Sequence, residues 1–352
     1  MFGFDAERAH ELGMKALTSG AATMFAGVDV DKLSEDLNIQ LFGLKFKNPL
    51  GIAAGFDKNG VAVNQLASLG FGFVEVGTVT YDPQPGNDKP RMFRLPADRA
   101  LINRLGFNNE GAIAIAKRIR SLKRNCVVGV NIGKNKSVPN EEAVENYLLS
   151  FDLVHPVADY IAINISSPNT PDLRELQKGD SLDELVSAIQ KRNLELGRKP
   201  LLVKIAPDLS DAEIETAAEK CLAHNVDGII ATNTTISRAG LKTADVEAFG
   251  AGGLSGEPLR SRSNEVIKRI YKHAKGKLPI IGVGGVFNGQ DAFEKIANGA
   301  SLIQAYTGFV YGGPRFPFNT LSELSSIFRE RGFSSVIDAV GSDAGLRNSD
   351  YL

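Results

Sequence analysis

The sequence contains few of the residues that form disulfides or bind metal ions. Its 352 residues include two cysteines, four histidines and no tryptophan. Cys126 falls at the start of a predicted strand and Cys221 in a predicted apolar helix, so we expect two buried, reduced thiols rather than a disulfide. CxxC, HExxH and Walker motifs are absent, as is any cluster of histidine with aspartate. A resident metal ion is therefore not expected.

Long apolar runs and an excess of one charge are also missing. No apolar stretch approaches the roughly 20 residues of a membrane-spanning helix. The opening sequence MFGFDAERAHELGM lacks the pattern of a signal peptide, and its mixed charges argue against a transit peptide. The net charge of −1 gives no general attraction to nucleic acid. The composition alone therefore predicts a cytoplasmic protein without a nucleic-acid partner.

What the sequence does contain is a repeated apolar pattern. Eight short runs rich in valine, isoleucine, leucine or alanine recur along the chain, and each ends in small or polar residues. Segments with helical patterning separate them. This alternation predicts a (β/α)8 or TIM barrel, an α/β fold that carries its chemistry at the carboxyl ends of the strands. The runs begin at Asn48, Phe71, Val127, Tyr160, Pro200, Gly228, Pro279 and Ser301, and helices are predicted at 60–69, 111–122, 140–151, 181–196, 210–224, 263–273, 288–298 and 320–329.

Residues 1–40 do not fit this rhythm, and we expect them to be a small helical extension of a barrel domain that spans residues 41–352. One helix is predicted over residues 5–19, with Leu12 on its apolar side, and a second short one over residues 21–28. Their apolar faces must pack on another part of the molecule. Two interpretations are open: a cap over the bottom of the barrel, or an apolar entrance for a co-substrate or a membrane surface.

Three further segments lie outside the repeat. Residues 41–47 alternate between apolar and polar side chains, as in a strand of a small hairpin that plugs the amino-terminal end of the barrel. Residues 80–103, after the second strand, form a long proline-rich insertion, and residues 236–262 form another after the sixth strand. Long insertions at the carboxyl face of a barrel are usually functional, so we expect the first of them to contribute to a site.

The last two strands predict a phosphate site. They end in GVGGVFNG and AYTGFVYGGP. In many barrels the loops at these positions bind phosphate through backbone N–H groups of a glycine turn and the amino end of a following helix. Glycine-rich strand ends also make simple tight turns, but two such loops at the expected strands favour a phosphorylated ligand.

Polar side chains stand at the ends of the other strands. Thr78, Asn131, Asn164 and the segment Thr232–Thr234 supply hydroxyls and amides suited to the alternating donors and acceptors of a flat heteroaromatic ring. Lys204 interrupts the apolar strand PLLVKIAP, and a buried lysine is costly unless it is paired. From the residues alone, Lys204 could form a structural salt bridge, place a charge beside a flavin or form a Schiff base.

Few residues at the barrel mouth could take a proton. None of the four histidines falls at a predicted strand end, and carboxylates are scarce there apart from Asp57. The candidates are Asp57, Lys58 and Ser167, which lies in the loop NISSPNTPDLR after the fourth strand. Serine is a poor base without a hydrogen-bond relay, for which Thr170 is a candidate. Taken by itself, the loop favours a simple turn with a helix cap.

Ten longer motifs go beyond this general pattern: AAGFDKNG, GFGFVEVGTVT, PRMFRLPADRALINRLGFNNEG, GVNIGKN, INISSPNTPDLR, LLVKIAPDLS, ATNTT, GGLSGEPLR, GVGGVFNGQDA and QAYTGFVYGGP. Together they resemble the dihydroorotate dehydrogenase family, in order and from about Asp5 to Pro314. Ser167 decides the class, because the soluble enzymes of that family carry cysteine at this place. The helical extension also resembles that of the membrane-associated, quinone-dependent (class 2) enzymes.

The resemblance implies an activity and a set of partners. It implies oxidation of (S)-dihydroorotate to orotate in the de novo synthesis of UMP. FMN would accept the hydride, and ubiquinone or menaquinone would be the final electron acceptor. The N-terminal segment would admit the quinone and contact the membrane surface, on the cytoplasmic side of the cell membrane, as part of a monomeric, peripheral protein.

The resemblance also assigns residues to these ligands. FMN would contact Ala54, Gly55, Lys58, Thr78, Asn131, Asn164, Lys204 and Thr232, with its phosphate near Gly256, Gly285, Tyr306 and Thr307. Dihydroorotate would contact Lys58, Asn103, Arg104, Leu105, Gly106, Phe107, Asn164, Asn169, Asn233 and Thr234. Ser167 would take the C5 proton with Thr170 as a relay, and the quinone would enter near Arg94 and Tyr306.

Two other functions are compatible with the residues taken without the resemblance. A Schiff-base lyase that uses Lys204 or Lys58 would be colourless and would be trapped by borohydride with a carbonyl substrate. A ligand-binding barrel that has lost its activity would fold without turnover. The presence of Ser167, Lys58 and the asparagines argues against this last possibility.

Overall fold

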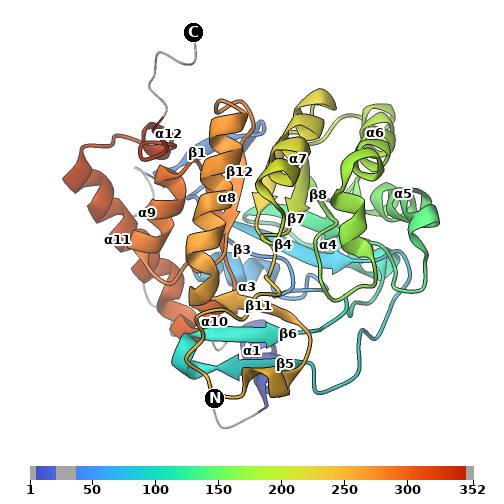
Figure 1. Ribbon diagram of the computed structural model, residues 1–352, viewed down its shortest axis with the longest axis horizontal. Helices are drawn as coiled ribbons and strands as arrows, with labels where there is room; N and C mark the ends of the chain where they lie inside the picture. Colours follow the sequence, from blue (N-terminus) through green and yellow to red (C-terminus); the bar gives the residue numbers. More distant parts are fainter. Residues whose placement is uncertain (1–4, 21–36, 346–352) are drawn as a thin grey trace.

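The computed structural model describes residues 5–20 and 37–345. The chain folds into the predicted (β/α)8 barrel (Figure 1). Eight parallel strands pair in the closed order β10-β12-β13-β3-β4-β7-β8-β9. The eight apolar runs of the sequence are these strands, so the prediction of fold class is confirmed. The strands are β3 (Leu50–Ile52), β4 (Phe73–Val79), β7 (Val127–Ile132), β8 (Tyr160–Asn164), β9 (Leu201–Ile205), β10 (Gly228–Ala231), β12 (Ile280–Val283) and β13 (Leu302–Ala305).

Helices follow the strands and surround the barrel, as the periodicity predicts. Local signals mark their ends: at the start of α7, the Ser210 hydroxyl accepts from the Glu213 N–H, and the Glu213 carboxylate accepts from the Ser210 N–H at 2.8 Å, which is the expected capping box. The eight predicted helices are α3 (Val63–Ser68), α4 (Ala112–Ser121), α5 (Ala143–Val154), α6 (Gly179–Glu195), α7 (Asp211–Ala223), α8 (Arg260–His273), α9 (Gly289–Ala297) and α11 (Phe316–Arg331). Two short helices, α10 (Thr307–Gly312) and α12 (Val336–Ala339), were not predicted.

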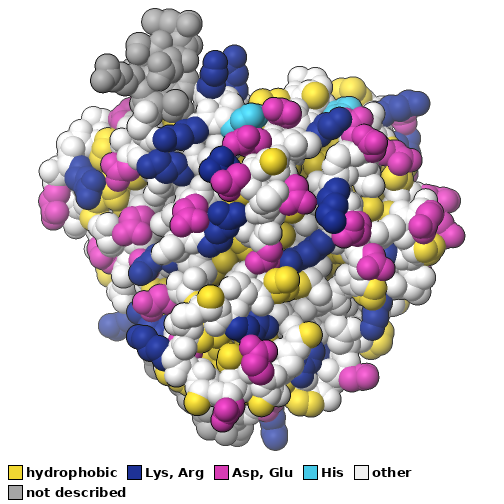
Figure 2. Space-filling model, viewed as in Figure 1, with side chains coloured by type: hydrophobic (Ala, Val, Ile, Leu, Met, Phe, Trp, Pro, Cys, Tyr) yellow, Lys and Arg dark blue, Asp and Glu magenta, His cyan; other side chains and the backbone are white. Residues whose placement is uncertain are grey.

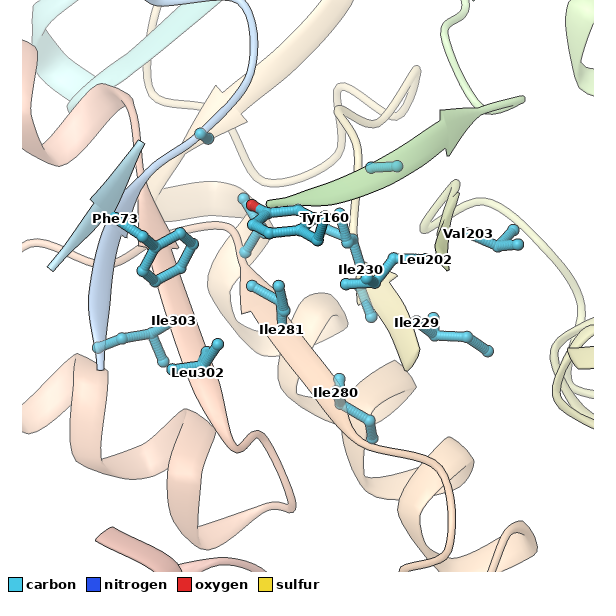
Figure 3. Close-up of a cluster of buried hydrophobic side chains, with 14 of the residues drawn as sticks. Phe73, Tyr160, Leu202, Val203, Ile229, Ile230, Ile280, Ile281, Leu302 and Ile303 are labelled. Atoms are coloured by element: carbon cyan, nitrogen blue, oxygen red, sulfur yellow. The ribbon is translucent and has the colours of Figure 1, made fainter. Parts of the chain in front are cut away.

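The inside of the barrel is filled by large side chains facing glycines. Figure 3 shows Phe73 and Tyr160 among the branched side chains of β10, β12 and β13. A Cβ atom at Gly51 would overlap the ring of Phe73, and one at Gly129 would overlap the ring of Tyr160. Below them, the hairpin of β1 (Ile39–Leu41) and β2 (Leu44–Phe46) places Phe46 edge-on to Phe73, with ring centroids 5.4 Å apart. The predicted plug is therefore present, and space for a ligand is left at the carboxyl ends of the strands.

Both long insertions meet in a second, three-stranded antiparallel sheet. It is built from β5 (Met92–Leu95), β6 (Ala100–Asn103) and β11 (Gly253–Gly256) and has a small apolar core of its own. The sequence analysis did not predict this sheet. Its strands are only four residues long, and the paired residues of β6 and β11 are 150 positions apart in the sequence. A local sequence pattern therefore cannot predict their pairing.

Helix α1 (Ala6–Thr18) docks beside this sheet, on the side of the barrel opposite β1 (Figure 1). This placement rules out the bottom-cap interpretation for α1. The predicted second helix, residues 21–28, lies outside the described residues. The predicted apolar side of α1 was partly wrong, because Leu12 is 39% exposed whereas Glu7 is buried. A buried ion pair explains the difference: the Arg91 guanidinium lies 2.8 Å from the Glu7 carboxylate.

The structure agrees with the predictions for the two cysteines and the surface charge, except for the burial of Cys126. Both cysteines are free, and Cys221 is buried as predicted, but Cys126 is only half-buried. Figure 2 shows positive and negative side chains intermixed on the visible face, in line with the net charge of −1. Mixed charges of this kind produce no large field of one sign on that face.

We expect the Glu7–Arg91 pair to hold α1 on the barrel. Burial acts to raise the pKa of Glu7, but the hydrogen bond and charge of Arg91 outweigh it, and the pKa is lowered. The contribution of the pair is therefore complete above pH 4.5 and is lost as the pH falls through the lowered pKa. Glu7→Gln should speed amide hydrogen exchange in residues 6–18 at pH 7 by about tenfold or more, because Arg91 stays buried without its counter-charge.

Glu11→Gln is the matched control for this test. Glu11 lies on the same helix, but its carboxylate is 55% exposed and pairs with Lys89 at 3.4 Å. An exposed pair of this kind contributes about 0–1 kcal/mol, so exchange should change little. Equal exchange rates in the Glu7→Gln and Glu11→Gln proteins would show that the buried pair does not anchor the helix.

Candidate active site

A cavity opens at the carboxyl ends of the barrel strands. Strands β4, β8, β9, β12 and β13 contribute residues to it, as does Asn103 at the end of β6 (Ala100–Asn103). The segments that directly follow β3 and β10 and the loop that carries Ser167 complete the lining. Most residues predicted from the sequence line this cavity: Ala54, Gly55, Lys58, Thr78, Asn103, Leu105, Gly106, Phe107, Asn164, Ser167, Asn169, Lys204, Thr232, Asn233, Thr234, Gly256, Gly285, Tyr306 and Thr307. Residues far apart in the chain are thus brought to one place by closure of the barrel.

Four of the residues that the resemblance assigns to ligands do not line the cavity. Asn131 lies beneath it and accepts from the Thr78 hydroxyl at 2.6 Å. The Arg104 guanidinium turns away and donates to the carbonyls of Phe249 and Ala251. Arg94 lines a separate groove beside α1, together with Asp5, Ala6, Met92, Phe93, Pro96 and Phe249. Thr170 is buried three residues after Ser167, and the described residues offer its hydroxyl no hydrogen-bond partner.

The floor of the cavity is a buried polar network around Glu75, which the sequence analysis missed. One carboxylate oxygen accepts from Asn131 Nδ2 at 2.9 Å, and the other accepts from Tyr160 Oη at 2.9 Å and Gln304 Nε2 at 2.8 Å. Lys204 Nζ lies 3.9 Å from Glu75. The signal was present in the sequence, because Glu75 is the only charged residue in the strand run FGFVEVGT.

Lys204 has the buried carboxylate partner that the salt-bridge interpretation expects. It faces Glu75, and it also lines the cavity. Burial lowers the pKa of Lys204, and the charge of Glu75 acts in the opposite direction. A buried lysine held by one carboxylate can therefore present positive charge to a ligand above the floor.

The cavity wall carries several amides that contact one another. Asn169 Nδ2 lies 3.3 Å from Asn103 Oδ1, and Asn233 Nδ2 lies 3.2 Å from Asn164 Oδ1. Lys58 is the cation on this side, and burial lowers its pKa to about 8. Amides in this arrangement suit a planar ligand with alternating N–H and C=O groups, and the lysine suits an anionic one.

The structure separates the three candidate proton acceptors. Asp57 is not available for chemistry, because its two oxygens accept from the N–H groups of Val61 and Ala62 at 2.9 and 2.8 Å at the start of α3. Burial raises the pKa of Asp57. Ser167, in contrast, lines the cavity and is 5% exposed, and its oxygen accepts from the Asn169 N–H at 3.2 Å. Ser167 is thus placed to act on a ligand.

Orphaned polar atoms and glycines mark where a large polar ligand fits. The Thr232 hydroxyl, the Gln304 carbonyl oxygen and the Tyr306 hydroxyl are buried, and the described residues give them no hydrogen-bond partner. Buried polar groups of proteins nearly always have one. At Gly285, with φ of +74°, a Cβ atom would overlap Arg260, so only glycine allows the backbone to form this part of the wall.

An aromatic cluster lies between the cavity and α1, and Tyr306 is its member that lines the cavity. Phe56 packs edge-on against Tyr306, with ring centroids 5.6 Å apart, and against His10 of α1 at 5.1 Å. The sequence analysis placed every histidine away from the strand ends, but docking of α1 brings His10 to this point. Burial and the charge of Lys58 lower the pKa of His10 to about 3, so it is neutral at pH 7.

The fold and the cavity together have the architecture of a barrel enzyme, with catalytic groups at the carboxyl ends of its strands. A family model described as dihydroorotate dehydrogenase matches residues 36–328. The chain belongs to the dihydroorotate dehydrogenase family. This assignment agrees with the resemblance seen in the motifs, and it favours a dehydrogenase over the Schiff-base lyase.

Individual relatives agree over nearly the whole chain. A protein of Gloeobacter violaceus named dihydroorotate dehydrogenase (quinone) is 49% identical over 345 residues, which are 97% of this chain and 96% of the relative. One of Anaeromyxobacter dehalogenans with the same name is 48% identical, covering 97% of this chain and 95% of the relative. The crystal structure of the Eimeria tenella enzyme in complex with ferulenol has a TM-score of 0.90 at 39% identity, covering 97% of this chain and 96% of that one.

Among residues 5–20 and 37–345, no helix has the length and apolar character needed to cross a membrane.

We expect the Glu75 network to stabilise the barrel. Glu75→Gln would leave Lys204 without its carboxylate and would turn an N–H group toward donors that now contact an oxygen. Equilibrium unfolding in urea should show a loss of about 3 kcal/mol. Glu195→Gln is the control, because that carboxylate is 48% exposed and pairs with Arg192 on the surface, where a loss below about 1 kcal/mol is expected. Equal losses in both variants would contradict a special role for the buried network.

Proposed function

We propose that this protein is a quinone-dependent dihydroorotate dehydrogenase, which oxidises (S)-dihydroorotate to orotate in the de novo synthesis of pyrimidine nucleotides. The observation that carries the proposal is the meeting of Ser167, Lys58 and five asparagines around one cavity, in a chain of this family. The substrate is an anionic ring whose imide and amide edge has alternating N–H and C=O groups, and the product is planar. Amides match the ring edge, the lysine matches the carboxylate, and the serine is the proton acceptor.

We further propose that FMN is the cofactor. Enzymes of this family are flavoproteins, and FMN supplies a two-electron acceptor for the substrate hydride when it is bound. The orphaned oxygens of Thr232, Gln304 and Tyr306 and the glycine-lined wall at Gly285 fit such a group. Its ring and ribityl chain would be held by Ala54, Gly55, Lys58, Thr78, Asn164, Lys204 and Thr232, and its phosphate by Gly256, Gly285, Tyr306 and Thr307. Asn131, beneath the cavity, would hold Thr78 and Asn164 in place.

The protein's own residues would divide the work on the substrate. Lys58 holds the carboxylate, and Asn103, Asn164, Asn169 and Asn233, with Thr234, bond the ring edge. The segment from Arg104 to Phe107 supports this binding; Leu105, Gly106 and Phe107 line the cavity, and Arg104 ties the segment to the loop at Phe249. Ser167 Oγ takes the C5 proton. Because serine is a weak base, the unpaired hydroxyl of Thr170 is the proposed relay for that proton.

The electron acceptor would use the other side of the cavity. We assign the aromatic wall at Phe56 and Tyr306, and the groove that contains Arg94, to the approach of ubiquinone or menaquinone. Residues 1–40 would form the quinone entrance and would lie on the cytoplasmic face of the cell membrane, and residues 41–352 would form the FMN-binding barrel. The docking of α1 beside this groove supports the division. We propose a monomeric, peripheral membrane protein.

The purified protein should be yellow and should release one FMN, and no FAD, per chain on heating. Under anaerobic conditions dihydroorotate should bleach the flavin absorbance without added quinone, and decylubiquinone should restore it. Chromatography of the released cofactor and stopped-flow absorbance measure the two parts. A colourless preparation, or bound FAD, would overturn the cofactor assignment; bound FMN that dihydroorotate does not reduce would leave an inactive ligand-binding barrel.

Ser167→Ala should slow flavin reduction by dihydroorotate about a hundredfold or more while FMN stays bound. Ser167→Cys should keep part of the activity, because a thiolate is a stronger base than a hydroxyl. Ser150→Ala is the control: Ser150 is a buried serine of α5 that does not line the cavity, so flavin reduction should keep the wild-type rate. Reduction at the wild-type rate in Ser167→Ala would mean that another group takes the proton.

A further inference from the structure

One arginine outside the cavity ties together three loops that surround it. Arg174 lies in the 3-10 helix η5 (Leu173–Gln177), seven residues after Ser167, and it does not line the cavity. Its Nε donates to the Ser166 carbonyl at 3.1 Å, its Nη2 donates to the Thr234 carbonyl at 3.0 Å, and its Nη1 lies 2.8 Å from Asp208 Oδ2. All three nitrogens of the guanidinium are therefore engaged, each by a different segment of the chain.

The three segments differ in what they carry. Ser166 directly precedes the proposed base, Thr234 belongs to the proposed substrate wall after β10, and Asp208 follows β9. Asp208 makes further contacts of its own: it accepts from the Thr235 hydroxyl and from the Ile236 N–H at 3.2 Å. The Arg174–Asp208 pair thus fixes two backbone segments that border the cavity. One is at Ser166, next to Ser167, and the other is at Thr234–Ile236, after β10.

The geometry requires arginine rather than a general positive charge. A guanidinium is a rigid planar fork that can serve three acceptors in different directions, whereas a lysine ammonium is a point charge on a flexible chain. The side chains of Arg174 and Asp208 are each 21% exposed, so water competes with this network only in part. Without the guanidinium, the Ser166 carbonyl would lose its hydrogen-bond donor, and the orientation of Ser167 would no longer be fixed.

We propose that Arg174 is a positioning residue that holds Ser167 at the distance from the substrate at which proton transfer from C5 occurs. This inference rests on the proposed function, because it assumes that Ser167 takes that proton. Arg174 acts through the backbone of Ser166 and through Asp208, not by touching the substrate. Its removal therefore weakens proton transfer more than it weakens substrate binding.

The test is anaerobic flavin reduction by dihydroorotate in the FMN-loaded protein, followed by stopped flow. Arg174→Lys should lower the limiting rate about tenfold or more, because misplacing a catalytic group by a fraction of an ångström has effects of this size. The substrate concentration at half-maximal rate should change less than the rate does. With substrate deuterated at C5, the isotope effect should rise above the wild-type value, whereas with substrate deuterated at C6 it should not.

Two further variants keep the test decisive. Asp208→Asn should show the same rise of the C5 isotope effect, since Asp208 holds the guanidinium, and it serves if Arg174→Lys does not fold. Arg192→Lys is the matched control: Arg192 forms a two-point pair with Asp152 at 2.8 and 3.0 Å between α5 and α6, away from the cavity. It should leave both rate and isotope effects unchanged.

The outcomes separate this inference from the function on which it rests. If dihydroorotate does not reduce the flavin of the wild-type protein, the proposed function itself is wrong. If the wild type is reduced but Arg174→Lys and Asp208→Asn keep its rate and its C5 isotope effect, the positioning role is wrong. A lower rate with an unchanged C5 isotope effect would also overturn it, because the arginine would then only stabilise the fold.

Discussion

Closing eight parallel strands into one barrel directs all their carboxyl ends to the same face, and the rest of this molecule depends on that constraint. The interior is filled, because Phe73 and Tyr160 occupy the space opposite Gly51 and Gly129. The amino-terminal end is closed by the β1–β2 hairpin. Residues from 53 to 308 can therefore share a ligand only at the carboxyl face, where the polar strand ends meet.

The same closure puts a charge where water cannot reach it, and the sequence must supply its partners. Glu75 is fully buried, and its donors come from β7, β8 and β13, with Lys204 of β9 nearby. An unpaired carboxylate at this depth would cost several kcal/mol. The same contacts of Glu75 therefore do two things: they join strands across the barrel, and they keep Lys204 at the floor of the cavity.

Patterns within short stretches of sequence predicted most of the fold and the polar strand ends, because strand ends and glycine turns are local features. The resemblance to the family supplied much of the remaining cavity lining. Features that depend on distant pairing were not predicted. The β6–β11 pair, the buried Glu7 of α1 and the position of His10 all follow from where separate segments dock. The path of the Arg104 side chain likewise depends on a loop some 145 residues away, to whose carbonyl it donates. A residue's place in a motif indicates that it is near the site, not where its side chain points.

The cavity has two chemically different sides, and this difference suits two unlike reaction partners. Asn103, Asn164, Asn169 and Asn233 make one side polar, while Tyr306 lines another part and packs against Phe56, which in turn contacts the neutral His10. A pyrimidine acid gains hydrogen bonds on the first side and would leave amides unpaired by binding elsewhere. A quinone with an apolar tail gains by burial on the second. Under the proposed function, the amides and the aromatic cluster would therefore serve different partners.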